Sequence, residues 1–134
     1  MGTIGNSFDV KSVKYGHARK VWREITDIYP AGGVISNIAD WVEVGKIPAG
    51  TPVKYDISNK KIEALTDTDI AAGDVATLGI NGFLQEDIVV ASSSTVGTGT
   101  VVYGGEIYGY MFADATLTAL GGVGAMIKKV LIVA

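Results

Sequence analysis

The chain has 134 residues, of which 48% are hydrophobic and 19% are charged, and its formal net charge is −3. This length favours one domain with a single hydrophobic core. With no cysteine and one histidine, the composition excludes disulfides and thiol catalysis and argues against a zinc site of the usual type. No apolar run approaches the roughly 20 residues of a membrane span, and the first residues lack a signal-peptide pattern, so we expect neither membrane insertion nor classical secretion.

Positive charge is concentrated near the N-terminus. Residues 1–30 carry a net charge of +2, whereas residues 31–134 carry −5. This distribution favours a basic arm that docks on an acidic partner, and a solvated surface is the alternative. A nucleic-acid partner is not expected, because phosphates would repel the acidic body.

The first 45 residues are predicted to form an N-terminal arm and contact segment, and residues 46–134 a β-rich domain. Phe8–Tyr15 alternates apolar and polar residues with a slip at Lys11-Ser12. We expect either an imperfect strand or an extended arm that pairs with the sheet edge of another chain. Residues 8–20 are called the basic arm below.

Residues between the basic arm and position 45 are predicted to be extended and then irregular. In Arg19–Ile25 (RKVWREI), alternate side chains should face opposite ways, which places Trp22 and Ile25 on different faces. Pro30–Gly33 should break the chain, and an irregular turn around Trp41 should follow.

From residue 46 the pattern predicts strands joined by tight turns. The 18 glycines are interleaved with β-branched residues. In IPAGTPVKYD, Pro48, Gly50 and Pro52 predict a sharp corner that leads into a strand. A hairpin should follow, with strands Val53–Ile57 and Ile62–Leu65.

The middle of the chain is predicted to contain an acidic loop at Thr66–Gly73 and a type I′ hairpin turn at Asn81-Gly82. A short buried strand is expected at Ile88–Val90. Ser92–Thr100 (SSSTVGTGT) has the composition of a mobile loop.

The stretch TVVYGGEIYGYMF is predicted to form two strands, Thr100–Val102 and Glu106–Phe112, separated by a break at the two glycines. Both faces of the second strand are apolar, so we expect burial on both sides, by the core and by a neighbouring subunit.

The C-terminal part should contain the one short helix of the domain and a last strand. Asp114 is expected to cap a helix over Ala115–Leu120, which Gly121-Gly122 should end. Val130–Val133 has the pattern of the last strand.

The residues do not favour an enzyme or a cofactor site. His17 is the single histidine and lies among basic residues, and no Gly-x-Ser-x-Gly motif accompanies it, so a small hydrolase is not expected. The aspartates around Thr66–Gly73 do not complete a calcium-loop pattern. Tyr103, Tyr108 and Tyr110 could form a platform for sugars, although core or interface positions are more typical of such a stripe.

Three stretches, in order, resemble those of tailed-phage head decoration and head-fibre base proteins: Ala49–Pro52 (AGTP), Gly82–Val90 (GFLQEDIVV) and Val101–Tyr108 (VVYGGEIY). Ile88 departs from the family pattern, which has Val there. The resemblance implies a small β-tulip-like barrel or sandwich that forms trimers on the outer capsid surface of the virion, after synthesis in the host cytoplasm. It also implies the major capsid protein as partner, and a short decoration protein without a distal fibre.

The resemblance assigns contact roles to two groups of residues. The capsid-binding group in the basic arm comprises Phe8, Val10, Lys11, Val13, Lys14, Tyr15, Arg19 and Lys20. The expected subunit or shell contacts are Trp22, Trp41, Tyr108, Tyr110 and Phe112, with core burial as the alternative for Trp41. A carbohydrate-binding module that uses Tyr108 and Tyr110 remains the alternative function, and a host surface glycan is a further possible partner.

Overall fold

The computed structural model describes residues 20–73, 75–91 and 96–134, and these form a mainly β protein with 39% strand and 20% helix. The predicted strand at Phe8–Tyr15 lies outside the described residues. The strands are β1 (Trp22–Ile28), β2 (Gly33–Ile35), β3 (Lys46–Ile47), β4 (Pro52–Asp56), β5 (Lys61–Ala64), β6 (Gly82–Leu84), β7 (Ile88–Val89), β8 (Thr98–Gly99), β9 (Val101–Tyr108), β10 (Met126–Ile127) and β11 (Lys129–Val133).

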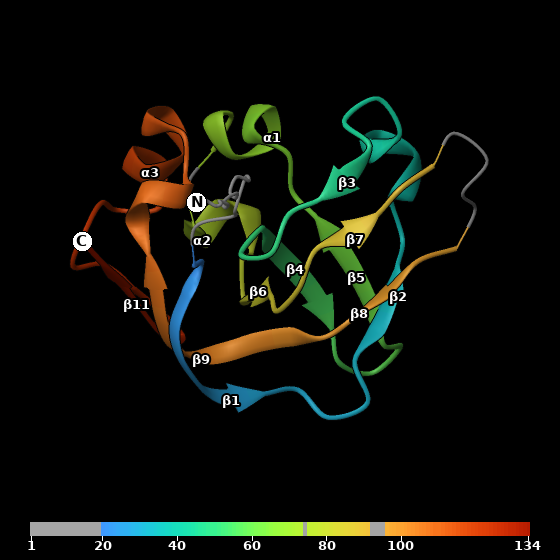
Figure 1. Cartoon of the computed structure of the whole chain (residues 1–134), viewed down its shortest axis with the longest axis horizontal. Helices are drawn as coiled ribbons and strands as arrows, with labels where there is room; N and C mark the ends of the chain where they lie inside the picture. Colours follow the sequence, from blue (N-terminus) through green and yellow to red (C-terminus); the bar gives the residue numbers. More distant parts are fainter. Residues whose placement is uncertain (1–19, 74, 92–95) are drawn as a thin grey trace, which may run out of the picture.

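Three short α-helices, not the single one expected, occur in the described part of the chain. They are α1 (Asp67–Ala71), α2 (Val75–Leu78) and α3 (Asp114–Ala119), with two 3₁₀ helices, η1 (Ile38–Trp41) and η2 (Gly109–Met111). In Figure 1, α1 and α3 lie together at the top of the view, while β9 and β1 run along the bottom.

The main sheet is mixed, with the strand order β10-β11-β9-β6-β4-β5-β2-β8 and with β1 paired to β9. The pairs β9–β11 and β2–β5 are parallel, and the others are antiparallel. Only Thr100 separates β8 from β9, so the path of paired strands returns to the same stretch of chain, as Figure 1 shows. A separate sheet pairs β3 with β7.

Both faces of the central strands are buried within one copy of the chain. In β6, Phe83 and Leu84 are both fully buried, but in different apolar clusters, because successive side chains of a strand point to opposite faces. Val101 and Val102 of β9 divide between the same two clusters. At these positions of β6 and β9, both faces are therefore covered by this chain's own core, whereas Tyr110 in the stretch predicted to be buried on both sides is 40% exposed.

Several local predictions are confirmed. Strands β4 and β5 form the expected hairpin, with Val53 opposite Ala64. Helix α3 ends where expected, at Gly121 and Gly122, whose φ angles of 105° and 80° favour glycine. However, Asp114 is the first residue of α3 and not its cap, because the N-cap is Ala113, which has no side-chain hydrogen bond.

The predicted acidic loop at Thr66–Gly73 is wrong, because α1 lies there. Thr66 Oγ1 accepts a hydrogen bond from the Asp69 backbone N–H at 3.2 Å, and Asp69 Oδ2 accepts one from the Thr66 N–H at 3.1 Å. This capping box satisfies two backbone donors at the helix start. Asp69 therefore stabilises the first turn of α1.

The two glycines of β9 do not break the strand, contrary to the sequence prediction. Gly105 has φ 144°, and a side chain there would meet the Glu24 backbone of β1, while a side chain on Gly104 would meet Asp27. These glycines therefore permit the close approach of β1. The strand ends at Tyr108, where η2 begins, so the alternation predicted as far as Phe112 is wrong beyond that point.

Two other predictions near β7 and β8 need correction. The expected buried strand at Ile88–Val90 is only partly buried, since Val89 is 81% exposed and Val90 is 3% exposed. The expected loop at Ser92–Thr100 contains β8, which pairs with β2 through Gly33 and Gly99.

Strand β1 is irregular, and this changes which of its residues face the core. Trp22 pairs with Ile107, and Glu24 pairs with the next residue, Glu106, so one residue bulges between them. As a result, Trp22 and Ile25 contact the same cluster, and their predicted placement on opposite faces is wrong. Since β1 and β2 are strands of the main sheet, the sheet has no break at the expected boundary between residues 45 and 46.

Asn81 does not form the predicted hairpin turn. Helix α2 precedes it, and its side chain bridges the backbone of one residue in β4. Asn81 Oδ1 accepts a hydrogen bond from the Tyr55 N–H at 2.8 Å, and Asn81 Nδ2 donates one to the Tyr55 carbonyl at 2.9 Å. The Asn81 amide thus forms with Tyr55 the two backbone hydrogen bonds that a paired strand would otherwise form.

We predict that Asn81→Ala lowers the free energy of unfolding by about 1–3 kcal/mol, because it leaves two partly buried backbone groups unsatisfied. The matched control is Asn59→Ala, whose exposed amide bonds the Asp56 side chain and should change stability by less than about 0.5 kcal/mol. Urea unfolding measures both. Equal effects would show that the bridge to Tyr55 contributes nothing specific.

Candidate functional site

The corner IPAGTP packs tightly against two other segments of the chain. Gly50 has φ 84°, and its N–H donates a hydrogen bond to the Leu84 carbonyl at 2.7 Å. A side chain at Gly50 would meet Val21 and Met111. Glycine is required here by both the backbone conformation and the space.

Further hydrogen bonds hold this corner in one shape. Thr51 Oγ1 donates to the Pro48 carbonyl at 2.6 Å, and Asp87 Oδ1 accepts from the Ala49 N–H at 2.7 Å. Asp87 also forms an ion pair with Lys46 at 3.5 Å between partly exposed side chains. The stiff corner therefore fixes how β3, β4 and the segment after β6 meet.

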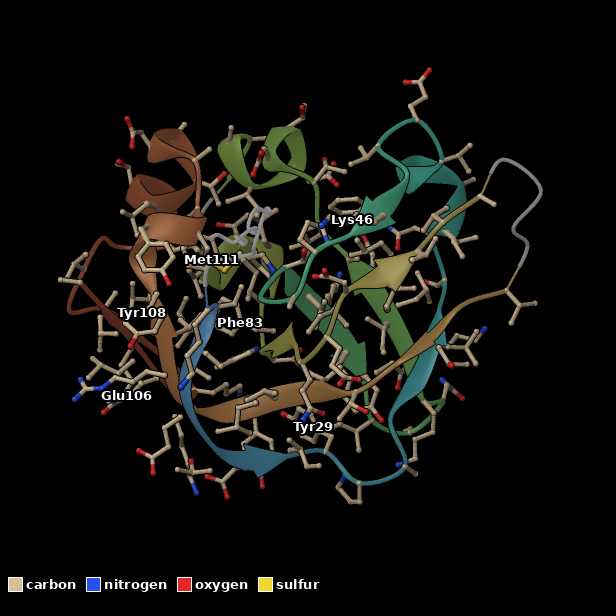
Figure 2. The ribbon with its side chains drawn as sticks, in the orientation of Figure 1. Tyr29, Lys46, Phe83, Glu106, Tyr108 and Met111 are labelled. Atoms are coloured by element: carbon tan, nitrogen blue, oxygen red, sulfur yellow. The ribbon has the colours of Figure 1, made fainter. Side chains whose placement is uncertain are left out.

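The first described residues, Lys20 and Val21, lie beside this corner, and each accepts a hydrogen bond from the segment around η2. The Tyr108 N–H donates a hydrogen bond to the Val21 carbonyl at 2.9 Å, and the Tyr110 hydroxyl donates to the Lys20 carbonyl. Figure 2 shows Tyr108 and Met111 on the side of the molecule where β1 begins. The end of the basic arm is thus fixed next to η2.

The expected contact residues divide between the core and the surface. Trp22, Trp41 and Phe112 are buried, with 7–8% of their surface exposed, in this chain's own core. Trp22 Nε1 donates to the Leu84 carbonyl at 3.3 Å, and Trp41 Nε1 donates to the Ala64 carbonyl at 3.2 Å. The indoles are therefore satisfied internally, as the core alternative for Trp41 anticipated.

Tyr108 and Tyr110 stack on each other, with ring centroids 5.1 Å apart and an interplanar angle of 12°. Tyr110 is 40% exposed. Since the rings cover one face of each other, only the outer faces could receive a sugar. Of the basic arm, Lys20 is described and exposed. The predicted contacts Phe8, Val10, Lys11, Val13, Lys14, Tyr15 and Arg19 lie outside the described residues.

Two of the hollows on the surface of the described part are candidate sites. The first, here called the polar cleft, has a volume of about 590 Å³ and is lined by residues that include Tyr29, Lys60, Gln85 and Glu86. The second, here called the apolar groove, has a volume of about 380 Å³. Its largest side chains are those of Trp41, Val44, Pro48, Leu65, Met111 and Phe112.

A cluster of tyrosines borders the polar cleft. The Tyr29 ring lies 4.4 Å from that of Tyr103 and 4.9 Å from that of Tyr55, and Lys129 Nζ lies 6.0 Å from the Tyr103 ring centroid. Burial, with smaller contributions from Tyr103 and Tyr55, raises the pKa of Tyr29. Sequence analysis missed this cluster because the rings come from three separate segments, and no local spacing signals their contact.

The described residues contain no cluster of three or more side chains that could hold a metal ion. Asp67 instead accepts a hydrogen bond from Thr116 Oγ1 at 2.6 Å, which ties α1 to α3. No helix in this part of the chain has the length and apolar character needed to cross a membrane.

We predict that Tyr29 ionises above the ordinary tyrosine pKa of 10.0. In an alkaline titration, Tyr29→Phe should therefore remove the tyrosine ionisation that occurs at the highest pH. A raised pKa favours the neutral phenol in the folded state, so its stabilising contribution is full below pH 10 and is lost as pH rises through the folded pKa. Tyrosinate absorbance across an alkaline titration provides the measurement. If the ionisation at the highest pH is unchanged in Tyr29→Phe, it does not belong to Tyr29, and the prediction is contradicted.

Comparison with known proteins identified no family for this chain. A scan against models of protein families gave no match. A search of curated proteins found no similar sequence. What the chain does is therefore inferred from its residues and their arrangement.

Proposed function

We propose that this chain is a structural protein of a tailed-phage virion, which binds the outer capsid surface as a trimer and stabilises the head. The observation that carries the proposal is that the three stretches of the resemblance meet in the sheet, since the first leads into β4, the second begins with β6 and the third is β9. Pro52 pairs with Phe83, Phe83 pairs with Val102, and Leu84 pairs with Val101. The resemblance therefore concerns one packed unit, β4-β6-β9, and not three unrelated short matches.

The basic arm is the proposed capsid-binding element, and the major capsid protein is its partner. The arm enters the body at Lys20 and Val21, where the body holds the backbone. Ordering the arm costs about 1–2 kcal/mol per residue, so one arm binds weakly. Three joined arms gain avidity of roughly 10²–10⁴-fold, and binding to the assembled shell alone stabilises it by mass action.

The segment around Val89 in β7, with Val96 just before β8, is the proposed trimer contact. Val89 and Val96, at 81% and 69%, are the most exposed large apolar side chains in the described part of the chain. Because Trp22, Trp41 and Phe112 are buried within the copy, this segment is better placed for a subunit contact than they are.

A carbohydrate-binding module is the second candidate function. The polar cleft favours it, because tyrosine, amide and carboxylate side chains line one hollow of about 590 Å³. The stacked pair Tyr108 and Tyr110 favours it less, since each ring covers part of the other. Capsid binding separates the two functions, because a sugar-binding module has no reason to bind shells.

We predict that the protein is a trimer by size-exclusion chromatography with light scattering, and that Val89→Glu converts it to monomers by placing a charge in the contact. The control is Met126→Glu, at a side chain 64% exposed on β10, which should leave the trimer intact. A wild-type monomer at micromolar concentration would contradict the trimer.

We predict that the double variant Lys11→Glu, Lys14→Glu loses binding to purified shells, because it reverses the charge of the arm while leaving the body unchanged. The control is Lys60→Glu, Lys61→Glu, which makes the same charge change at the exposed β4–β5 turn and should still bind. Co-sedimentation with shells measures both variants. Undiminished binding by the arm variant would refute the role of the arm.

A further inference from the structure

The apolar groove lies between η1, the IPAGTP corner, α1 and η2, and the described residues leave it open. Trp41 and Phe112 lie at its floor with 7–8% exposure, while Val44 at its edge is 61% exposed. An open apolar hollow of about 380 Å³ at the meeting point of four segments is a typical place for an extended chain to dock.

The segments that line this groove are acidic, and one of their carboxylates belongs to the lining itself. Asp67 lines it, Asp40 and Glu43 flank the groove residues Trp41 and Val44 in sequence, and Asp114 follows the lining residue Ala113. Among the described residues, ion pairs join Arg23 to Glu106 and Lys46 to Asp87, and none of them involves these four carboxylates. The rim therefore favours a positively charged occupant.

The basic arm has the matching chemistry. Over residues 8–20 it carries Lys11, Lys14, Arg19 and Lys20 against the single acid Asp9, and apolar side chains alternate with these charges. An extended segment of this pattern presents apolar side chains to one side and charged ones to the other. It can thus fill an apolar floor while its cations reach an acidic rim.

The arm also begins at the mouth of the groove. Val21 and Met111 lie next to each other at Gly50, because a side chain added there would meet both, and Met111 also lines the groove. The Tyr110 hydroxyl holds the Lys20 carbonyl beside them. At 3.3–3.6 Å per residue, the seven residues from Lys20 back to Val13 span up to about 25 Å, so residues of the arm can reach beyond Met111 along the groove.

We propose that the apolar groove binds this chain's own basic arm, with apolar side chains of residues 8–19 on its floor and the basic side chains at its rim. The short connection gives an effective concentration in the millimolar range, which favours the chain's own arm over that of another copy. The arm is then stored on the body, and any other partner of the arm must compete with the groove. This inference does not depend on the proposed capsid role.

Because the chain contains no cysteine, disulfide trapping in the full-length protein gives a direct test. The test pair is Val13→Cys with Val44→Cys. The control pair is Val13→Cys with Ile57→Cys, at a side chain 52% exposed beyond the far end of β4 from the groove. With oxidised glutathione, the groove pair should form its disulfide at least about tenfold faster than the control pair, and the product should be monomeric on a non-reducing gel.

The second part of the test changes the charges around the groove. Adding Asp40→Lys and Glu43→Lys to the groove pair should slow trapping several-fold, as should 1 M salt, where the Debye length is about 3 Å. Adding Glu86→Lys, on the separate polar cleft, should leave the rate unchanged. Equal rates for the groove and control pairs, or a product made of disulfide-linked dimers, would overturn the proposal. Since no shell is present, neither result bears on capsid binding.

Discussion

The burial of adjacent side chains on opposite faces of β6 and β9 is the constraint on which the rest of the structure depends. Phe83 and Leu84, like Val101 and Val102, are fully buried in different clusters, and full burial of each such side chain stabilises the fold by about 1.5–3 kcal/mol. One cluster is closed by β1, β11 and the helices, and the other by η1 and the hairpin β4–β5. Both apolar clusters must therefore form before the side chains of the central strands are buried.

This arrangement limits where the protein can meet partners. Phe83, Leu84, Val101 and Val102 leave little of the central strands exposed, so the contacts proposed above are at the rim of the molecule: the end of the basic arm, the segment around Val89, the polar cleft and the apolar groove. The stiff corner at Gly50 joins two of these places, because it packs against both the start of β1 and the groove residue Met111.

Features set by neighbouring residues could be predicted from the sequence, and features set by distant ones could not. The β4–β5 hairpin and the glycines that end α3 follow from local turn and cap chemistry. Asn81-Gly82 has the same local signal as a hairpin turn, but the backbone of Tyr55, 26 residues away, decides its role. The enrichment of tryptophan at contacts predicts a contact role for Trp22, whereas in the fold it pairs with Ile107 and is buried in the core. The apolar groove had no signal, since its lining comes from four segments.

The central claim is that one copy of the chain covers both faces of its central strands without help from another. Amide hydrogen exchange of β6 and β9, followed over a wide range of protein concentration, tests this most directly. If the claim holds, the Leu84 and Val102 amides remain protected to the same extent in the most dilute samples. Protection that disappears on dilution would show that a second copy is needed to complete the core.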